Sequence, residues 1–144
     1  MGQNEKLLWL VDVGLPKLSK TELDVVYAEE LLHRPGPAGL NRAIELDRVL
    51  VTVDQEFRGT WALPLMHPGI VILDSRPVDE HELDRNLRNL QFRIAQNDRP
   101  TLMTNSRFVI RLDKGIAQIM QDGSELAFEP WKQIRIQATP ALAW

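Results

Sequence analysis

The chain has 144 residues, a formal net charge of −3 at pH 7 and no cysteine. This length is enough for one domain with a substantial core, and the lack of thiols excludes disulfides, thiolate nucleophiles and zinc–thiolate sites. No apolar run approaches the ~20 residues that span a bilayer, so we expect no membrane anchor and a location in the reducing cytoplasm. The small negative charge gives no general attraction to nucleic acid, and RNA binding would need a local basic patch.

Four apolar runs in the first half of the chain predict the strands of a buried sheet. They lie at residues 7–11, 25–28, 49–53 and 70–73. Continuous apolar runs of this length are typical of parallel strands that are covered on both faces. Between and after these runs, short helices are predicted at residues 18–22, 29–33, 39–47 and 58–65.

The clearest helical pattern covers residues 79–97. Asp79 and Glu82 form a capping pattern at its start, where negative charge favours a helix N-terminus. Apolar residues then recur at intervals of four, three and four, namely Leu83, Leu87, Leu90 and Ile94. This spacing predicts one apolar stripe that faces the core.

The C-terminal part of the chain changes character. Strands are predicted at residues 101–105 and 107–112, followed by short apolar segments at 116–120, 125–128 and 134–136. Short segments around the Asp122-Gly123 turn are typical of an antiparallel hairpin or meander. Such a meander would extend or cap one edge of the sheet.

The alternation of strands and helices over residues 7–98 predicts an α/β fold. Right-handed βαβ units would build a three-layer α/β/α sandwich with a mainly parallel sheet. We therefore expect residues 1–112 to form the α/β domain and residues 113–144 to be a C-terminal β extension of the same domain.

Three of the apolar strands end in an aspartate, at Asp12, Asp54 and Asp74. The carboxyl ends of parallel neighbours meet at one edge of a sheet, where α/β folds place their ligands. Carboxylates without a His or Cys partner favour Mg²⁺ or Mn²⁺, and such a metal supports phosphodiester hydrolysis. The alternative is that each Asp starts a turn or caps the next helix.

Four motifs resemble, in order, those of the PIN-like nuclease families. They are VDVGLP at 11–16, DVVYAEEL at 24–31, RVLVTVDQEF at 48–57 and HPGIVIL at 67–73. The resemblance is to the small bacterial PIN-like proteins of unassigned function, related to VapC-type toxins. Their strands typically read LDENLP, HDVVHV, RVLVTxDxDF and GIVVL. The resemblance covers about residues 6–112 of this chain.

The resemblance implies a metal-dependent endoribonuclease of the kind that serves as a toxin-like component, with a site at Asp12, Asp54 and Glu56. The chain departs from the family pattern at Gly14, where the family has Asn, and at residues 36–39, where the family has an acidic residue. A missing ligand would weaken Mg²⁺ binding, and these departures leave a second hypothesis open. In it, the chain is an inactive PIN-like module that acts through protein contacts, as a homo-oligomer or with an antitoxin-like partner.

Arginines accumulate in the second half of the chain. Arg85 and Arg88 lie off the apolar stripe of the predicted helix, and further arginines follow at positions 93, 99, 107 and 111. If several share a face, they form a basic patch able to hold an RNA backbone. The alternative is a solvated helix surface with local charge pairs.

Overall fold

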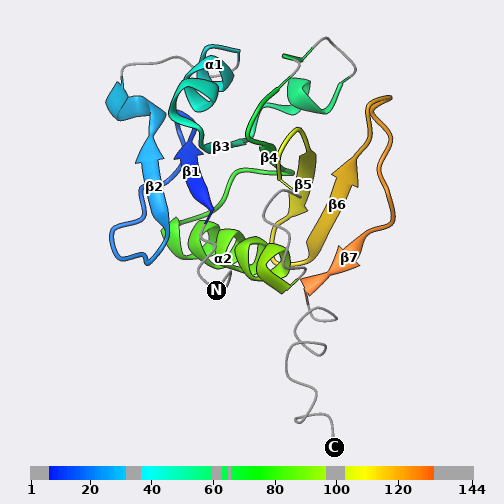
Figure 1. The fold of residues 1–144 in the computed structure, drawn as a ribbon. Coiled ribbons are helices and arrows are strands. Elements are labelled where there is room, and N and C mark those ends of the chain that lie inside the picture. The colour runs from blue at the N-terminus through cyan, green and yellow to red at the C-terminus, as the bar shows by residue number, and fades with distance from the viewer. Residues whose placement is uncertain (1–6, 32–36, 60–62, 65, 97–102, 132–144) are drawn as a thin grey trace, which may run out of the picture.

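The computed structural model describes residues 7–31, 37–59, 63–64, 66–96 and 103–131. In these ranges the chain forms an α/β structure with one mixed sheet of seven strands and two α-helices (Figure 1). The strand order across the sheet is β2-β1-β3-β4-β5-β6-β7. The predicted α/β class is therefore confirmed. Within the described ranges, neither helix has the length and apolar character needed to cross a lipid bilayer.

Five neighbouring strands run parallel, and each of the two further strands runs antiparallel to the strand before it in the sheet. The parallel strands are β1 Leu8–Val11, β2 Asp24–Tyr27, β3 Val49–Thr52, β4 Ile70–Leu73 and β5 Arg107–Arg111. Beyond β5, β6 (Gly115–Ile119) and β7 (Glu129–Pro130) continue the same sheet. Because β1, β3 and β4 are parallel neighbours, their carboxyl ends lie at one edge of the sheet.

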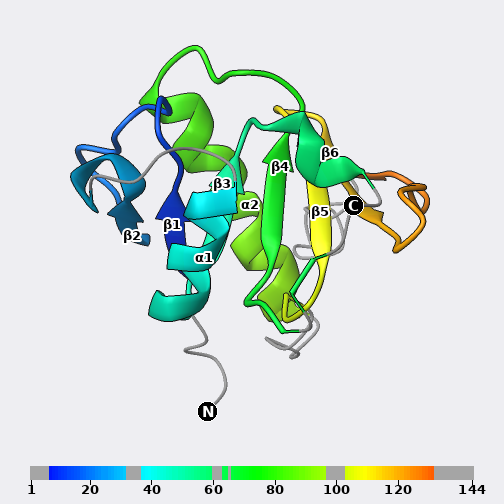
Figure 2. The same cartoon turned by 90° about the horizontal axis from the view of Figure 1, so that it is seen from above.

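The two helices cover opposite faces of the sheet, as Figure 2 shows. Helix α1 (Pro37–Leu46) contributes Leu40 and Ala43 to a core cluster with Leu10 and Leu50. Helix α2 (Glu80–Gln96) packs on the other face with the predicted stripe, and all four residues are buried, namely Leu83, Leu87, Leu90 and Ile94. Side chains alternate along each strand, so a strand such as β3 supplies both cores.

Two shorter helices follow strands. The 3₁₀ helix η2 (Ala28–Leu31) follows β2, in agreement with the helical turn predicted at 29–33, of which residues 32–33 lie outside the described residues. The 3₁₀ helix η3 (Gln55–Arg58) follows β3. The predicted helix at 58–65 is wrong at Leu63 and Pro64, which are not helical, while residues 60–62 and 65 lie outside the described residues.

The predicted helix at 18–22 is also wrong. Its backbone donors bond to side chains instead of to a helical ladder: Leu18 N–H donates to Tyr27 Oη (2.8 Å) and Ser19 N–H to Glu80 Oε1 (2.7 Å). Leu18 and Leu23 are buried in the α2-side core. These hydrogen bonds and the burial of the two leucines together hold this segment in a non-helical backbone.

The predicted strand at 101–105 is wrong over residues 103–105, which form a turn, and residues 101–102 lie outside the described residues. Asn105 has a left-handed backbone (φ 60°) and exchanges hydrogen bonds with His67. Of the predicted meander, β6 is present, but at 125–128 only Glu125 makes a β-bridge, with Ile119. The segment 134–136 lies outside the described residues.

Helix α2 is tied to the β5–β6 turn by Arg85 and Asp113. Arg85 Nε donates to Asp113 Oδ1 at 2.6 Å, and Nη2 donates to Oδ2 at 2.8 Å. These bonds from Arg85, helped by one from Asn86, lower the pKa of the Asp113 carboxyl from 3.8 to about 2.

We expect this pair to make the free energy of unfolding depend on acid pH. A carboxyl whose pKa is lower in the folded state contributes stability that is complete above its unfolded pKa, about 4, and is lost as the pH falls through about 2. Asp113→Asn keeps a residue that tolerates the left-handed backbone (φ 62°). Urea unfolding between these two pH values should show a flatter profile for the variant.

Asp47→Asn removes the same charge at another exposed left-handed position (φ 55°). Its profile separates the ion pair from the general effect of net charge. If Asp113→Asn and the wild type lose stability in parallel as the pH falls, the pair does not cause the dependence.

Candidate carboxylate site at the sheet edge

Asp12 follows β1 directly and is buried, with 4% of its surface exposed. Its N–H donates to Val51 O (2.9 Å) and continues the β1–β3 ladder, so Asp12 lies level with Thr52. Asp12 Oδ2 accepts a hydrogen bond from Thr52 Oγ1 at 2.6 Å, and Oδ1 accepts one from Val13 N–H at 2.8 Å. A buried carboxylate needs such donors, and these two fix its orientation.

Asp54 lies two residues beyond Thr52 and is the N-cap of η3. Its Oδ1 accepts from Glu56 N–H at 3.0 Å, which caps the helix. Its own N–H donates to Thr52 Oγ1, also at 3.0 Å. The Thr52 hydroxyl therefore joins the carboxylate of Asp12 to the backbone of Asp54.

The other two predicted acids are exposed. Glu56 lies in the first turn of η3. Asp74 follows β4, and its Oδ1 accepts from Leu112 N–H (3.2 Å) and from Ser75 Oγ (3.4 Å). By the β3–β4 register, Asp74 lies level with Asp54, but its carboxylate is bonded on the β5 side.

The structure thus links two of the predicted acids and not all of them. Asp12 and Asp54 share Thr52, with an offset of two residues along neighbouring strands, about 6.6 Å along and about 4.8 Å across. Helix α1 has no acidic residue in its first turn. Within the described ranges, no three side chains among His, Asp and Glu lie close enough to hold a metal ion by themselves.

The arginines predicted to bind RNA are engaged in ion pairs. Arg85 pairs with Asp113 as above, and Arg88 Nε donates to Asp84 Oδ2 at 2.8 Å, one turn away on α2. Both side chains are about half exposed, at 45% and 56%. Both arginines lie on α2, which covers one face of the sheet. Strand alternation places Asp12 and Thr52 on the other face, which α1 covers.

Three polar residues of this edge were not among the predicted site residues. They are Thr52, Gln55 and Arg76. Gln55 Nε2 donates to Val53 O (2.9 Å) and Leu73 O (2.8 Å), and so bridges β3 and β4 past the end of their ladder. Arg76 Nη1 donates to Gly14 O in the loop after Asp12. The available signal was Thr52, a polar residue inside an otherwise apolar strand.

We expect Thr52→Val to lower the free energy of unfolding by about 1–3 kcal/mol. Valine has nearly the same shape, but it removes the donor to Asp12 Oδ2 and the acceptor for Asp54 N–H at a fully buried position. Thr52→Ser keeps the hydroxyl and should lose less. Urea unfolding at neutral pH gives both values. Equal losses for the two variants would show that packing, and not the hydroxyl, matters here.

Hard carboxylate oxygens at one sheet edge are suited to a divalent cation. Comparison with known proteins adds no relative from which a function could be transferred. No protein-family model, no curated protein and no solved structure matches the chain.

Proposed function

We propose that the chain is a PIN-like protein with a three-layer α/β/α core, and that its carboxyl edge cleaves RNA with a bound Mg²⁺ or Mn²⁺. The observation that carries the proposal is the Thr52 hydroxyl, which holds Asp12 and joins it to Asp54. The motif resemblance around the same two aspartates supports it. The parallel order of β1, β3 and β4 supports it too, because that order places Asp74 at the same edge.

The donor set fits a small hard cation. Mg²⁺ is usually held by one or two carboxylates together with waters and substrate phosphates, without a complete cage of protein ligands. Asp12 and Asp54 supply two such carboxylates, so the lack of a three-acid group among the described residues is compatible with this mode. Hydrogen bonds that orient a ligating carboxylate support metal binding, and Thr52 and Val13 provide them for Asp12.

In this proposal, each residue has a distinct role. Asp12 and Asp54 hold the cation, and Asp74 provides a further carboxylate at the edge. When bound, the cation polarises a phosphate and lowers the pKa of a water molecule. Glu56, exposed two residues after Asp54, accepts the proton of the attacking water. Arg85 and Arg88 contact the RNA backbone from the side of α2.

The test is a cleavage assay with a labelled single-stranded RNA of mixed sequence. We expect the full chain to cut this RNA in MnCl₂ or MgCl₂ and to leave it intact in EDTA. Intact RNA with both metals would overturn the proposal. Cleavage that persists in EDTA would also overturn it, because it would not depend on the cation.

A second candidate function is an inactive PIN-like module that acts through protein contacts, with a second copy of itself or an antitoxin-like partner. The absence of a three-acid group in the described part of the chain favours it. So does the structural use of Asp54 as a helix cap. The same assay separates the two candidates, since the inactive module leaves RNA intact with either metal.

A further inference from the structure

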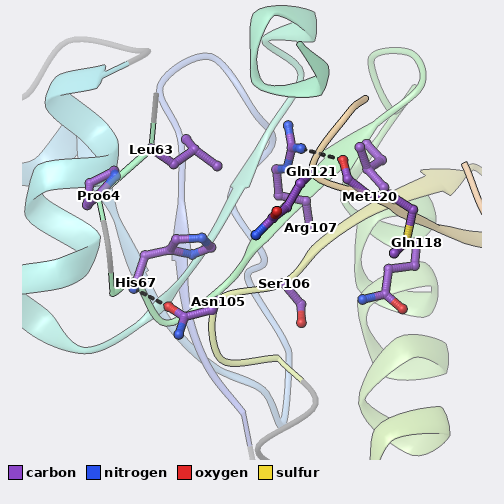
Figure 3. A pocket seen from close by; sticks show the side chains of 10 residues that line it. Leu63, Pro64, His67, Asn105, Ser106, Arg107, Gln118, Met120 and Gln121 are labelled. Atoms are coloured by element: carbon purple, nitrogen blue, oxygen red, sulfur yellow. Dashed lines mark hydrogen bonds between the residues drawn. The ribbon is translucent and has the colours of Figure 1, made fainter. Parts of the chain in front are cut away.

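A pocket of about 370 Å³ lies at the other end of the strands, near the start of β5 and the end of β6 (Figure 3). Its polar lining includes His67, Arg107 and Gln121, and its apolar lining includes Leu63 and Met120. β5 begins at Arg107, so the pocket lies toward the opposite end of the strands from the edge where Asp12 and Asp54 lie.

Arg107 is a buried cation, and its hydrogen-bond acceptors among the described residues are neutral oxygens. It is 6% exposed. Nη1 donates to Phe57 O (2.7 Å) and Gly59 O (2.6 Å), and Nη2 donates to Met120 O (2.7 Å). These bonds use three of the five N–H groups of a guanidinium. Nε–H and the second N–H of Nη2 therefore have no acceptor among the described residues.

No carboxylate among the described lining residues balances the positive charge of Arg107. Burial lowers the pKa of the guanidinium, but arginine stays charged at neutral pH. The described residues that line the pocket include no Asp or Glu. A buried charge without a counter-charge is unfavourable, and an anion in the pocket would relieve this cost.

His67 adds a neutral donor on the opposite wall. Gly69 N–H donates to His67 Nδ1 at 3.1 Å, so the neutral ring carries its proton on Nε2. Burial, and then the charge of Arg107, lower the pKa of His67 and keep the ring neutral. Figure 3 shows the His67 ring and the Gln121 amide pointing toward each other across the pocket.

We infer that this pocket binds a small oxyanion, a carboxylate or a phosphate, that carries a small apolar body. The unused N–H groups of Arg107 and the Nε2–H of His67 can donate to the anion. Leu63, Pro64 and Met120 can contact the apolar body. The inference does not depend on the proposed nuclease activity, because it uses none of the residues of the carboxyl edge.

The first experiment is calorimetric titration of the full chain with benzoate, inorganic phosphate and benzamide. We expect at least one of the two anions to bind and the neutral benzamide, which has nearly the shape of benzoate, not to bind. Binding of benzoate alone would identify a carboxylate ligand, and binding of phosphate would identify a phosphate ligand. If neither anion binds, or if benzamide binds as well as benzoate, the inference is wrong.

The second experiment locates the anion with Gln121→Glu, which places a carboxylate in the pocket at an exposed position where folding tolerates it. We expect the added negative charge to raise the dissociation constant of the bound anion at least about tenfold. An effect of this size matches the loss of one charge-assisted hydrogen bond. Asn41→Asp makes the same charge change at an exposed position of α1 that does not line the pocket, and it should leave the constant unchanged. Equal effects of the two variants would place the anion elsewhere.

Discussion

Asp54→Asn is expected to reduce metal-dependent RNA cleavage at least about 100-fold, since loss of a mere supporting partner of a metal ligand already costs about 10- to 100-fold. The variant keeps the shape of the side chain, and the Asn oxygen can still accept from Glu56 N–H and cap η3. It removes the negative charge that would hold the cation. The measurement is the initial rate of RNA cleavage in MnCl₂.

Asp47→Asn is the matched control for this variant. Asp47 is exposed and precedes β3, so it lies at the opposite edge of the sheet from Asp54. Its left-handed backbone (φ 55°) tolerates Asn as well as Asp. We expect cleavage by Asp47→Asn to match the wild type. A similar rate for Asp54→Asn and the wild type would remove Asp54 from the proposed site.

Asn86→Leu is expected to lower the free energy of unfolding by about 3 kcal/mol, because it leaves buried donors unsatisfied. Asn86 is fully buried on α2. Its Oδ1 accepts from Asp113 N–H (2.8 Å) and Trp131 Nε1 (3.0 Å), and its Nδ2 donates to Glu82 O (2.8 Å). It thus joins α2 to the β5–β6 turn and to the residue after β7.

Urea unfolding of Asn86→Leu should be compared with that of Asn41→Leu, which changes an exposed Asn on α1. We expect the control to stay within about 0.5 kcal/mol of the wild type. A loss of less than about 1 kcal/mol in Asn86→Leu would mean that this network does not hold α2 in place. The double variant with Trp131→Phe should lose little more than Asn86→Leu, since the donor of Trp131 is then already unsatisfied.

The features that could be predicted from the sequence are those that depend on residues close together in the chain. Continuous apolar runs gave strands close to the observed β3 and β4, and the leucine stripe gave α2 to within a residue at each end. Local sequence patterns do not show which residues of neighbouring strands lie beside each other. Asp12 directly follows the residue that pairs with Val51, whereas Asp54 lies three residues after Val51. The pairing of Asp12 with Thr52, and not with another acid, follows from this offset.

The predicted basic patch shows that charge pairs, like strand register, cannot be predicted from nearby residues alone. Between residues 85 and 111, the sequence offers only Asp98 as an acidic partner. In the structure, Arg85 and Arg93 pair with Asp113 and Glu129, and Arg111 pairs with Glu125. These acids all follow β5 in the chain. Asp113 lies in the β5–β6 turn beside α2, and Glu125 and Glu129 reach the arginines because β6 and the segment after it fold back along the sheet. A count of local charges cannot include them.

The central claim is that the edge formed by Asp12 and Asp54 binds a divalent cation. The most direct measurement is anomalous diffraction at the manganese absorption edge from crystals of the full chain soaked in MnCl₂. We expect a peak coordinated by the carboxylates of Asp12 and Asp54. No peak at this edge of the sheet, or manganese bound only elsewhere, would contradict the claim.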